Sequence, residues 1–593
     1  MNDLKSIKEA VVDSLTDLFG ENDWSKIIVL EQTKKEFSGD YTLVCFPLLR
    51  WSKNSPENTA MIIGENLLKN KAYFEDFNVV KGFLNLKLTQ SFWLSLFSQW
   101  FKDDDFGLIK KDSGKLFLVE YSSPNTNKPL HLGHVRNIFL GDSVVSLLKS
   151  VGHKVIRTQI INDRGIHICK SMIAWQRFAN GETPKNIGLK GDHFVGKYYV
   201  LFDKVYKEEI SDLISKGILE EDAKSKAPIL LAAKEMLIQW ENGNEEVRAL
   251  WAKMNGWVYE GFSKTYSDLG VGFDKLYFES DTYQLGKDVV LKGLESGVFY
   301  KKEDGSVWCN LSSKKMDDKL LIRSDGTTVY MTQDIGTAVQ RFNDFSNLSG
   351  VIYTVGNEQN HHFKVLFEIL NKLGFDWSTS CHHLSYGMVE LPEGKMKSRE
   401  GTVVDADDLL SSVVQEAKLL TGERGHLEGM NNDEVNVLCN KIGKSGLKYF
   451  LLKVDPKKSM TFDPKESIDL NGHTGPYIQY GFARITSLIE KFSDISDFNP
   501  LAFKLSSKEL EVVKMLSIFP ENLIHAAKEF SPSILANYLY GLVKVYNSFY
   551  QDSPVIKEEN NELRLFRIQL SSLTAKVIEK GMNILGIEMP KRM

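Results

Sequence analysis

The segment from residue 115 to residue 142 constrains the fold most, because it combines a strand, a turn and a helix start. Its sequence is KLFLVEYSSPNTNKPLHLGHVRNIFLGD, in which an apolar run predicts a buried strand and a polar, proline-containing stretch predicts a turn. The residues after His131 predict an amphipathic helix. His131 and His134 would share its first turn, where free N–H groups and the helix dipole favour anions. Gly133 would let a flat ligand approach closely, so the unit predicts a nucleotide-phosphate site.

Bulk properties restrict the class of protein. The 593 residues are enough for about three to five domains. The net charge of −5 argues mildly against a nonspecific nucleic-acid binder, so an RNA partner would have to meet local basic patches. No apolar run approaches the length of a membrane span, and the first residues predict an amphipathic helix rather than a signal peptide. The five separated cysteines predict reduced thiols, a cytoplasmic setting and no zinc site.

From residue 115 onward, strands alternate with helices, which predicts a parallel sheet with helical crossovers. A second strand ends in the sequence NDRG at residues 162–165, and ligand sites in such sheets lie at the carboxyl ends of the strands. A Lys/Glu-rich helical stretch then interrupts the alternation. Strands are expected to resume at 306–311, 319–332, 350–356 and 382–391, and none is expected beyond about residue 405.

A basic loop follows the last expected strand. It contains Lys395, Lys397, Ser398 and Arg399 in the sequence KMKSREGT. Lysine-rich loops are usually solvated surface, so the loop alone is a weak signal; its position at the end of a predicted strand, after the HLGH segment, strengthens it.

These segments resemble the signatures of class I aminoacyl-tRNA synthetases, HLGH the HIGH motif and the basic loop the KMSKS motif. The SSPN turn and the KPLHLGH run are similar to those of the arginyl-tRNA synthetase family in particular. The second lysine of KMSKS falls on Ser398, and Lys128 stands where a compensating lysine precedes HIGH in the family. The resemblance covers the chain nearly end to end.

The resemblance and the patterns together predict an α/β protein built around a Rossmann-like parallel sheet. We expect four regions: an N-terminal α+β domain that contacts tRNA, a catalytic domain with an insertion at about 180–275, a helical connecting region, and an α-helical anticodon-binding bundle. Their expected limits are 1–110, 111–404, 405–472 and 473–593.

Phosphate chemistry is assigned to the two signature segments. The resemblance implies that their side chains stabilise the charge that develops on the phosphates, with Mg²⁺ accompanying ATP. The implied catalytic residues are Lys128, His131, His134, Lys395 and Lys397. The implied ATP contacts are His131, Gly133, His134, Met388, Lys395 and Arg399.

A site that selects arginine needs groups that bind its guanidinium in a bidentate way. Carboxylates do so through paired charge-assisted hydrogen bonds. Glu120 ends the first strand, and Asp334 follows Tyr330 by four residues, as in a Y-x-x-x-D motif of the family. An isolated aspartate there could equally stabilise its own helix start. The implied arginine contacts are Glu120, Ser123, Asn125, Tyr330, Asp334 and Gln359.

The implied activity is that of an arginine–tRNA ligase, which forms arginyl-adenylate from L-arginine and ATP and transfers the arginine to arginine tRNA. Tyr477 and Tyr480 are candidates for stacking on anticodon bases, although most aromatic residues at helical spacing belong to the core. The resemblance implies a monomer with no membrane partner.

Two other functions are weighed against this one. A cysteine-specific ligase would need a cluster of zinc-binding thiolates, which the cysteine spacing denies. A tRNA-binding paralogue without catalysis would be expected to lose HLGH or the pocket carboxylate, and both are present.

Overall fold

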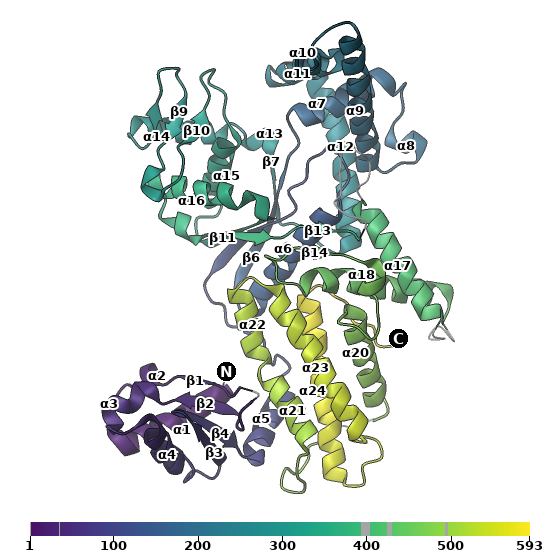
Figure 1. The fold of residues 1–593 in the computed structure, drawn as a ribbon. Helices are drawn as coiled ribbons and strands as arrows, with labels where there is room; N and C mark the ends of the chain where they lie inside the picture. Colours follow the sequence, from purple (N-terminus) through teal and green to yellow (C-terminus); the bar gives the residue numbers. More distant parts are fainter. Residues whose placement is uncertain (1, 35, 393–403, 424–429, 493–495) are drawn as a thin grey trace.

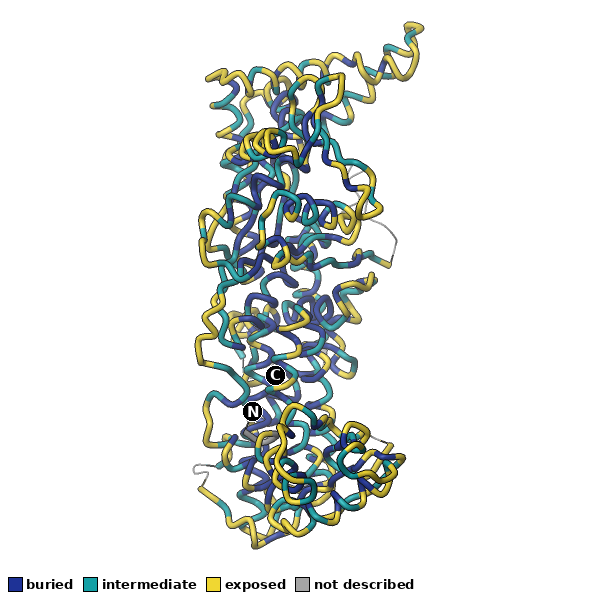
Figure 2. Tube along the Cα trace, turned by 90° about the vertical axis from the view of Figure 1, so that its left-hand side faces the viewer, coloured by how far each residue is buried: buried dark blue, intermediate teal, exposed yellow. Residues whose placement is uncertain are grey.

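The structure, a computed structural model, describes residues 2–34, 36–392, 404–423, 430–492 and 496–593. The molecule is elongated, as Figures 1 and 2 show from two sides. The N-terminal module and a helical bundle lie side by side at one end, a parallel sheet lies in the middle, and two lobes stand beyond it. Among the described residues, no helix combines the length and the apolar character needed to cross a bilayer.

The N-terminal module holds an antiparallel sheet of strand order β1-β2-β4-β3. A tight turn joins β3 to β4: Lys81 and Gly82 both have positive φ, which suits the twist of a two-residue hairpin. The module docks on the bundle, where Asp40 pairs with Lys514 and the Gln90 amide donates to the Phe503 carbonyl oxygen. Its elements are α1 (Asn2–Phe19), α2 (Trp24–Ile27), β1 (Leu30–Gln32), β2 (Tyr41–Val44), α3 (Leu49–Ser52), α4 (Pro56–Leu67), β3 (Phe74–Val80), β4 (Phe83–Leu88) and α5 (Gln90–Lys102).

The central sheet is parallel, with strand order β12-β11-β5-β6-β7. The chain runs outward from β5 in one direction through β6 and β7, and on the other side through β11 and β12. The carboxyl end of β5 is therefore the switch point at which such sheets bind ligands. The strands are β5 (Leu116–Glu120), β6 (Lys154–Ile161), β7 (Lys275–Phe278), β11 (Leu348–Gly356) and β12 (Cys381–Tyr386). The expected α/β class with a Rossmann-like sheet is confirmed.

Helices cover both faces of this sheet: α6 (Leu132–Ser150) packs on one face, and α15 (Tyr330–Asp344) and α16 (Asn360–Lys372) pack on the other. The short α13 (Glu279–Thr282) follows β7, and α14 (Leu285–Glu295) packs on α15. After β6 comes α7 (Ile166–Phe178), which packs on the helices of the insertion. The expectation that α6 is amphipathic is wrong. The sheet lies on one side of it and the bundle helices on the other, so most of its length is buried.

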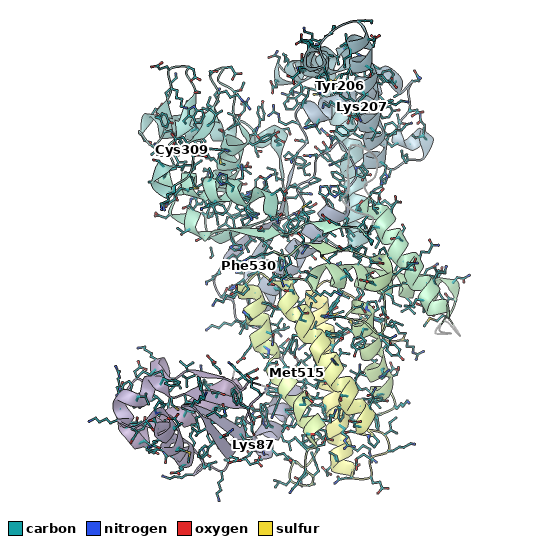
Figure 3. The ribbon with its side chains drawn as sticks, in the orientation of Figure 1. Lys87, Tyr206, Lys207, Cys309, Met515 and Phe530 are labelled. Atoms are coloured by element: carbon teal, nitrogen blue, oxygen red, sulfur yellow. The ribbon has the colours of Figure 1, made fainter. Side chains whose placement is uncertain are left out.

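Two strands expected after the insertion do form, but they do not join the parallel sheet. They pair in a separate antiparallel sheet of order β10-β9-β8, made of β8 (Tyr300–Lys301), β9 (Val307–Cys309) and β10 (Lys319–Ile322). Cys309, labelled in Figure 3, is a buried free thiol of this lobe. The last of these strands is shorter than expected, because α15 begins within the predicted range.

The other lobe is helical (Figure 1). In the sequence its helices follow α7 and precede β7, and α7 packs against them. It comprises α8 (Pro184–Ile187), α9 (Gly191–Ser215), α10 (Glu220–Lys226), α11 (Pro228–Glu241) and α12 (Glu245–Leu269). Glycine allows α9 and α12 to pack closely: a Cβ on Gly191 would lie 1.9 Å from the Trp257 carbonyl oxygen, and one on Gly261 would lie 2.4 Å from Asp192.

The C-terminal third is almost entirely helical, as expected. A two-residue strand, β14 (Met460–Thr461), pairs with β13 (Val389–Glu390) beyond the point where strands were expected to stop. The helices are α17 (Ala406–Glu423), α18 (Asn432–Leu452), α19 (Pro464–Ser467), α20 (Gly475–Ile489), α21 (Ser507–Ser517), α22 (Phe519–Lys528), α23 (Pro532–Asp552) and α24 (Asn561–Ile584). Phe530, labelled in Figure 3, brings its ring 4.8 Å from that of His382 in β12, which joins the bundle to the sheet.

Candidate active site

The HLGH segment caps α6 with its own two histidines. His131 is the N-cap residue, and its Nδ1 accepts a hydrogen bond from the Gly133 N–H at 3.2 Å. His134 Nδ1 in turn accepts from the His131 N–H at 3.1 Å, and the ring centroids are 3.9 Å apart. Because both Nδ1 atoms are acceptors, each neutral ring carries its proton on Nε2. The pair therefore offers two Nε2–H donors at a helix N-terminus.

These histidines are neutral at pH 7. Burial lowers the pKa of His131 to about 4, and the nearby Lys128 adds to the effect. Burial also lowers the pKa of His134 well below its ordinary value, with His131 and Lys128 contributing. The two histidines are therefore hydrogen-bond donors, and Lys128 is the cation of this segment.

The SSPN turn and the NDRG segment meet at the edge of the sheet, as their places after β5 and β6 predicted. Asn125 and Asn162 form a parallel β-bridge. Ser122 has positive φ, and its N–H donates to the Asn137 side chain of α6 at 2.6 Å. Its hydroxyl lies 2.8 Å from the Tyr266 hydroxyl of α12. The turn is thus held from both the helix that follows it and the insertion.

Asp163 anchors the NDRG segment and was not singled out from the sequence. It is buried and accepts hydrogen bonds from the Ser280 N–H at 2.9 Å, the Ser280 hydroxyl at 2.8 Å and the Tyr259 hydroxyl at 3.0 Å. Its backbone carbonyl accepts from the Trp251 indole at 2.6 Å. Asp163 therefore ties the end of β6 to α12 and α13.

Glu120 is placed differently from the expectation. It is 5% exposed and forms an ion pair with Arg341 of α15. Glu120 was expected to bind the guanidinium of the substrate arginine, but it binds the guanidinium of Arg341 instead. We therefore revise its role to that of the ion-pair partner of Arg341. Arg341 could have been noticed, since it follows Asp334 by seven residues and shares its helix face.

Two carboxylates, Asp334 and Glu279, lie close to each other and are called the acidic wall below. Asp334 lies one turn after Tyr330 in α15, and its Oδ2 is 2.6 Å from His362 Nε2. Glu279 of α13 lies near it and was missed by the sequence reasoning. Burial raises the pKa of Glu279 to about 7; Arg164 opposes this rise, and Asp163 and Asp334 add to it. Among the described residues Glu279 forms no ion pair. Such a carboxyl would be stabilised in its charged form by a cationic ligand.

The remaining predicted arginine contacts lie at the start of α15 and after the carboxyl ends of β5 and β11. Tyr330 begins α15 with 75% of its surface exposed, and Gln359 is exposed just before α16. Ser123 is half-buried and Asn125 exposed in the turn after β5. Ser123 and Asn125 follow β5, Gln359 follows β11, and β5 and β11 are neighbours in the sheet although they are far apart in the sequence.

Met388 stands between β12 and β13 and is 51% exposed. The connection that carries it is fastened to α6 by Arg136, a fully buried residue that the sequence reasoning did not use. Arg136 Nη1 donates to the Gly387 carbonyl at 2.7 Å, and its Nη2 donates to the Lys458 carbonyl at 2.8 Å. The predicted loop residues Lys395, Lys397 and Arg399 lie outside the described residues.

Comparisons with known proteins decide the family. Residues 99–463 match the family described as tRNA synthetases class I (R), catalytic domain. The chain belongs to the class I arginyl-tRNA synthetase family. Residues 5–88 match the arginyl tRNA synthetase N terminal domain, and residues 478–593 match the DALR anticodon binding domain. The resemblance stated from the HLGH and SSPN segments is confirmed.

Relatives and solved structures agree along the whole chain. It is 52% identical to the arginine–tRNA ligase of Bacteroides thetaiotaomicron over 98% of both chains. It is 53% identical to that of Flavobacterium psychrophilum, covering 99% of this chain and 98% of the relative. The fold is similar to that of the Thermus thermophilus arginyl-tRNA synthetase, with a TM-score of 0.78, 22% identity and coverage of 99% and 100%.

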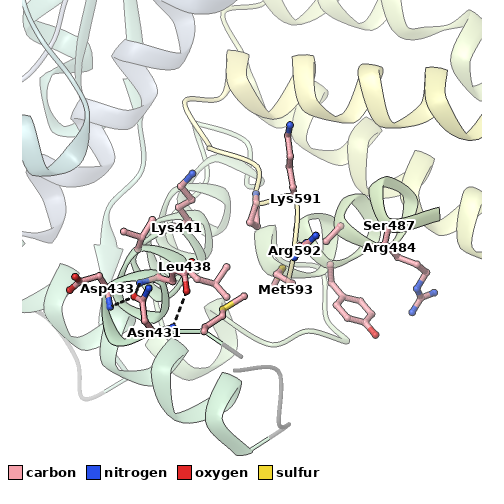
Figure 4. Close-up of a pocket in the computed structure, with 15 residues that line it drawn as sticks. Asn431, Asp433, Leu438, Lys441, Arg484, Ser487, Lys591, Arg592 and Met593 are labelled. Atoms are coloured by element: carbon pink, nitrogen blue, oxygen red, sulfur yellow. Dashed lines mark hydrogen bonds between the residues drawn. The ribbon is translucent and has the colours of Figure 1, made fainter. Parts of the chain in front are cut away.

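In this synthetase the two nominated tyrosines of α20 occupy different surroundings. The hydroxyl of Tyr477 accepts from the Asn547 side chain at 3.0 Å, and its ring packs 5.3 Å from that of Tyr540. Tyr480 lines a wide pocket of about 940 Å³ between α18, α20 and the C-terminus (Figure 4). The Arg484 guanidinium lies 5.0 Å from the Tyr480 ring centroid. Lys441, Lys591 and Arg592 also line this pocket.

Proposed function

We infer that the chain is an arginine–tRNA ligase, which activates arginine with ATP and then attaches it to arginine tRNA. The match along the full chain to curated arginine–tRNA ligases supports this activity. Within the chain, one observation carries the chemistry: the reciprocal capping of α6 by His131 and His134 presents two N–H donors beside the switch point of the sheet. No side chain has to become a covalent nucleophile.

In the first step an arginine carboxylate oxygen bonds to the α-phosphorus of ATP, and the bond from that phosphorus to pyrophosphate breaks. Catalysis then consists of positioning and of stabilising the charge on the phosphates. His131 and His134 donate hydrogen bonds, Lys128 supplies positive charge, and Gly133 and Met388 flank the nucleotide. Mg²⁺ would accompany ATP. The loop cations Lys395, Lys397 and Arg399 would add positive charge near the phosphates.

Arginine is bound between the turn after β5 and the acidic wall. Asp334 and Glu279 take the guanidinium, because each gains an opposite charge that the chain itself does not fully supply. Tyr330 and Gln359 line the side-chain region, and Ser123 and Asn125 lie near the α-amino and carboxylate groups. Glu120 and Arg341 contribute by fixing β5 to α15 rather than by touching the substrate.

In the second step the terminal ribose hydroxyl of the tRNA attacks the carbonyl carbon of arginyl-adenylate, and AMP leaves. Class I membership implies the 2′-hydroxyl. We assign the pocket of Tyr480 to an anticodon base, since an aromatic ring beside several cations suits stacking and phosphate contact. Tyr477 supports that pocket from the helix packing. The N-terminal module contacts the outer corner of the tRNA, and the enzyme works as a cytoplasmic monomer.

The test is a charging assay with purified protein, ATP, Mg²⁺ and arginine tRNA. Arginine should be attached, and citrulline, which is nearly isosteric but uncharged, should be rejected by about 10⁴-fold, because it leaves the carboxylates unpaired. Equal charging of both amino acids would contradict the acidic wall. A protein that binds tRNA but forms no adenylate would be the non-catalytic paralogue instead.

A further inference from the structure

A cluster of charged side chains, of which Asp192 is buried and the others are partly exposed, lies next to the HLGH segment, where the starts of α9 and α17 meet α12. Lys190 Nζ is 2.5 Å from Asp407 Oδ2, 3.2 Å from Asp192 Oδ2 and 2.5 Å from the Thr265 hydroxyl. His193 Nε2 is 3.0 Å from Asp407 Oδ2. Neither the HLGH and KMKSREGT segments nor the proposed reaction uses these residues.

The same start of α17 is bonded to the backbone of the catalytic turn. Asp405 forms an antiparallel β-bridge with His131, and the Ala406 N–H donates to the Leu130 carbonyl at 2.9 Å. His193 Nδ1 lies 3.7 Å from the Asp405 carboxylate. Asp407 is thus held from α9 and α12, while its neighbours hold the residues that precede and begin α6.

A small cavity completes the connection. It has a volume of about 200 Å³ and lies between α9 and the turn, with Lys128, His131, His193 and Asp405 in its wall. Any shift of α9 or α17 would therefore change the surroundings of Lys128 and His131 directly. The close contacts that Gly191 and Gly261 permit between α9 and α12 leave little room for such a shift.

The cluster is not suited to a metal ion. The ligand atoms of Asp192, His193 and Asp407 lie within 4.8 Å of one another, as a cation site would require. However, the Lys190 ammonium is already within hydrogen-bond distance of both carboxylates and supplies the positive charge that a metal would bring. A closed network of this kind holds backbone segments in one relative position.

We propose that Lys190, His193 and Asp407 are positioning residues for adenylate formation: they hold the Leu130–His131 backbone, and with it Lys128 and His131, in register with the ATP phosphates. The helical insertion is thereby a support of the nucleotide site. The proposal rests on the proposed arginine–tRNA ligase activity and adds three residues that do not touch the substrate.

The variants Asp407→Asn and Lys190→Met remove one charge each, and Lys190→Arg keeps the charge. Asp212→Asn is the matched control, because Asp212 lies near the end of the same helix α9 and forms an exposed ion pair with Lys216, the residue that follows the helix. Each protein is assayed by pyrophosphate exchange in the presence of arginine tRNA, and its KM for ATP and its KM for arginine are measured. Its melting temperature is measured alongside.

Asp407→Asn and Lys190→Met should raise the KM for ATP by about 10- to 100-fold, since misplacing a catalytic group by about 1 Å has effects of that size. The KM for arginine should stay within about twofold, because the acidic wall belongs to α13 and α15. Lys190→Arg should recover most of the ATP binding, and the Asp212 control should behave as wild type.

A lowered melting temperature with an unchanged KM for ATP would overturn the proposal, and so would equal increases for ATP and arginine. If the Asp407 variant does not fold, His193→Asn gives the same comparison, because it removes the contact of the His193 ring with Asp407 and leaves the Lys190–Asp407 ion pair in place. Failure of the wild-type protein to exchange pyrophosphate with arginine would instead contradict the proposed function itself.

Discussion

The guanidinium of Arg341 in α15 forms a buried ion pair with the carboxylate of Glu120, the last residue of β5. The two residues are 221 positions apart in the sequence. The pair joins the strand that leads into the SSPN turn to the helix that carries Asp334. Strand and helix are thus fixed relative to each other immediately below the proposed arginine site.

This pair leads to a prediction about stability. Arg341→Met should lower the free energy of unfolding by about 3–5 kcal/mol, because it leaves a buried carboxylate without its partner. The double variant Glu120→Leu with Arg341→Met should recover much of the loss. Denaturant unfolding of the single and double variants measures both effects. Were Glu120 a direct substrate ligand, Glu120→Gln would instead raise the KM for arginine without changing stability.

His134→Ala should lower kcat and kcat/KM for pyrophosphate exchange together, by about 2–4 kcal/mol in activation free energy, through loss of a preorganised donor. Because His134 also accepts the His131 N–H, a loss of about 1 kcal/mol in stability is expected from the cap. Affinity for tRNA should be unchanged. His525→Ala, at an exposed histidine of α22, serves as the control. Wild-type exchange in the His134 variant would make the histidine pair a structural cap only.

Asp334→Asn should weaken arginine binding by about 2–5 kcal/mol, because the shape is kept but the charge that pairs with the guanidinium is lost. The KM for ATP should change little. Kinetics with each substrate varied in turn separate the two effects, with Asp376→Asn on the exposed surface as control. An unchanged KM for arginine in the folded variant would return Asp334 to the role of hydrogen-bond partner of His362.

Glu279 predicts a pH dependence. Burial raises its pKa to about 7 from an ordinary 4.5, so the folded chain binds a proton there that the unfolded chain has lost. The contribution of Glu279 to stability should therefore fall as pH rises from about 4.5 to about 7. Arginine binding has the opposite sign: it favours the ionised carboxylate, so the KM for arginine should fall as pH rises toward 7.

The matched variant is Glu279→Gln, which cannot ionise. It should abolish the change in KM for arginine between about pH 6 and pH 8 and raise the value at pH 8. Kinetics across that range at fixed ionic strength measure it. A pH profile identical to that of the wild type would show that a group other than Glu279 sets the pH dependence of arginine binding.

Local sequence determined the elements that carry the chemistry. The strand, turn and helix of residues 115–150 form as the apolar spacing and the Pro-containing turn predict, and Asn125 and Asn162 meet because both follow parallel strands. These features depend on hydrophobic periodicity and turn chemistry, which act over a few residues.

Only the tertiary structure decided how those elements are used. It paired Glu120 with Arg341, brought Glu279 beside Asp334, and buried α6 between the sheet and the bundle, so that its histidines are neutral. It also placed β9 and β10 in a sheet of their own. Such outcomes depend on which groups lose water together and which charges then lie close, and the spacing of residues along one segment contains no information about partners hundreds of residues away.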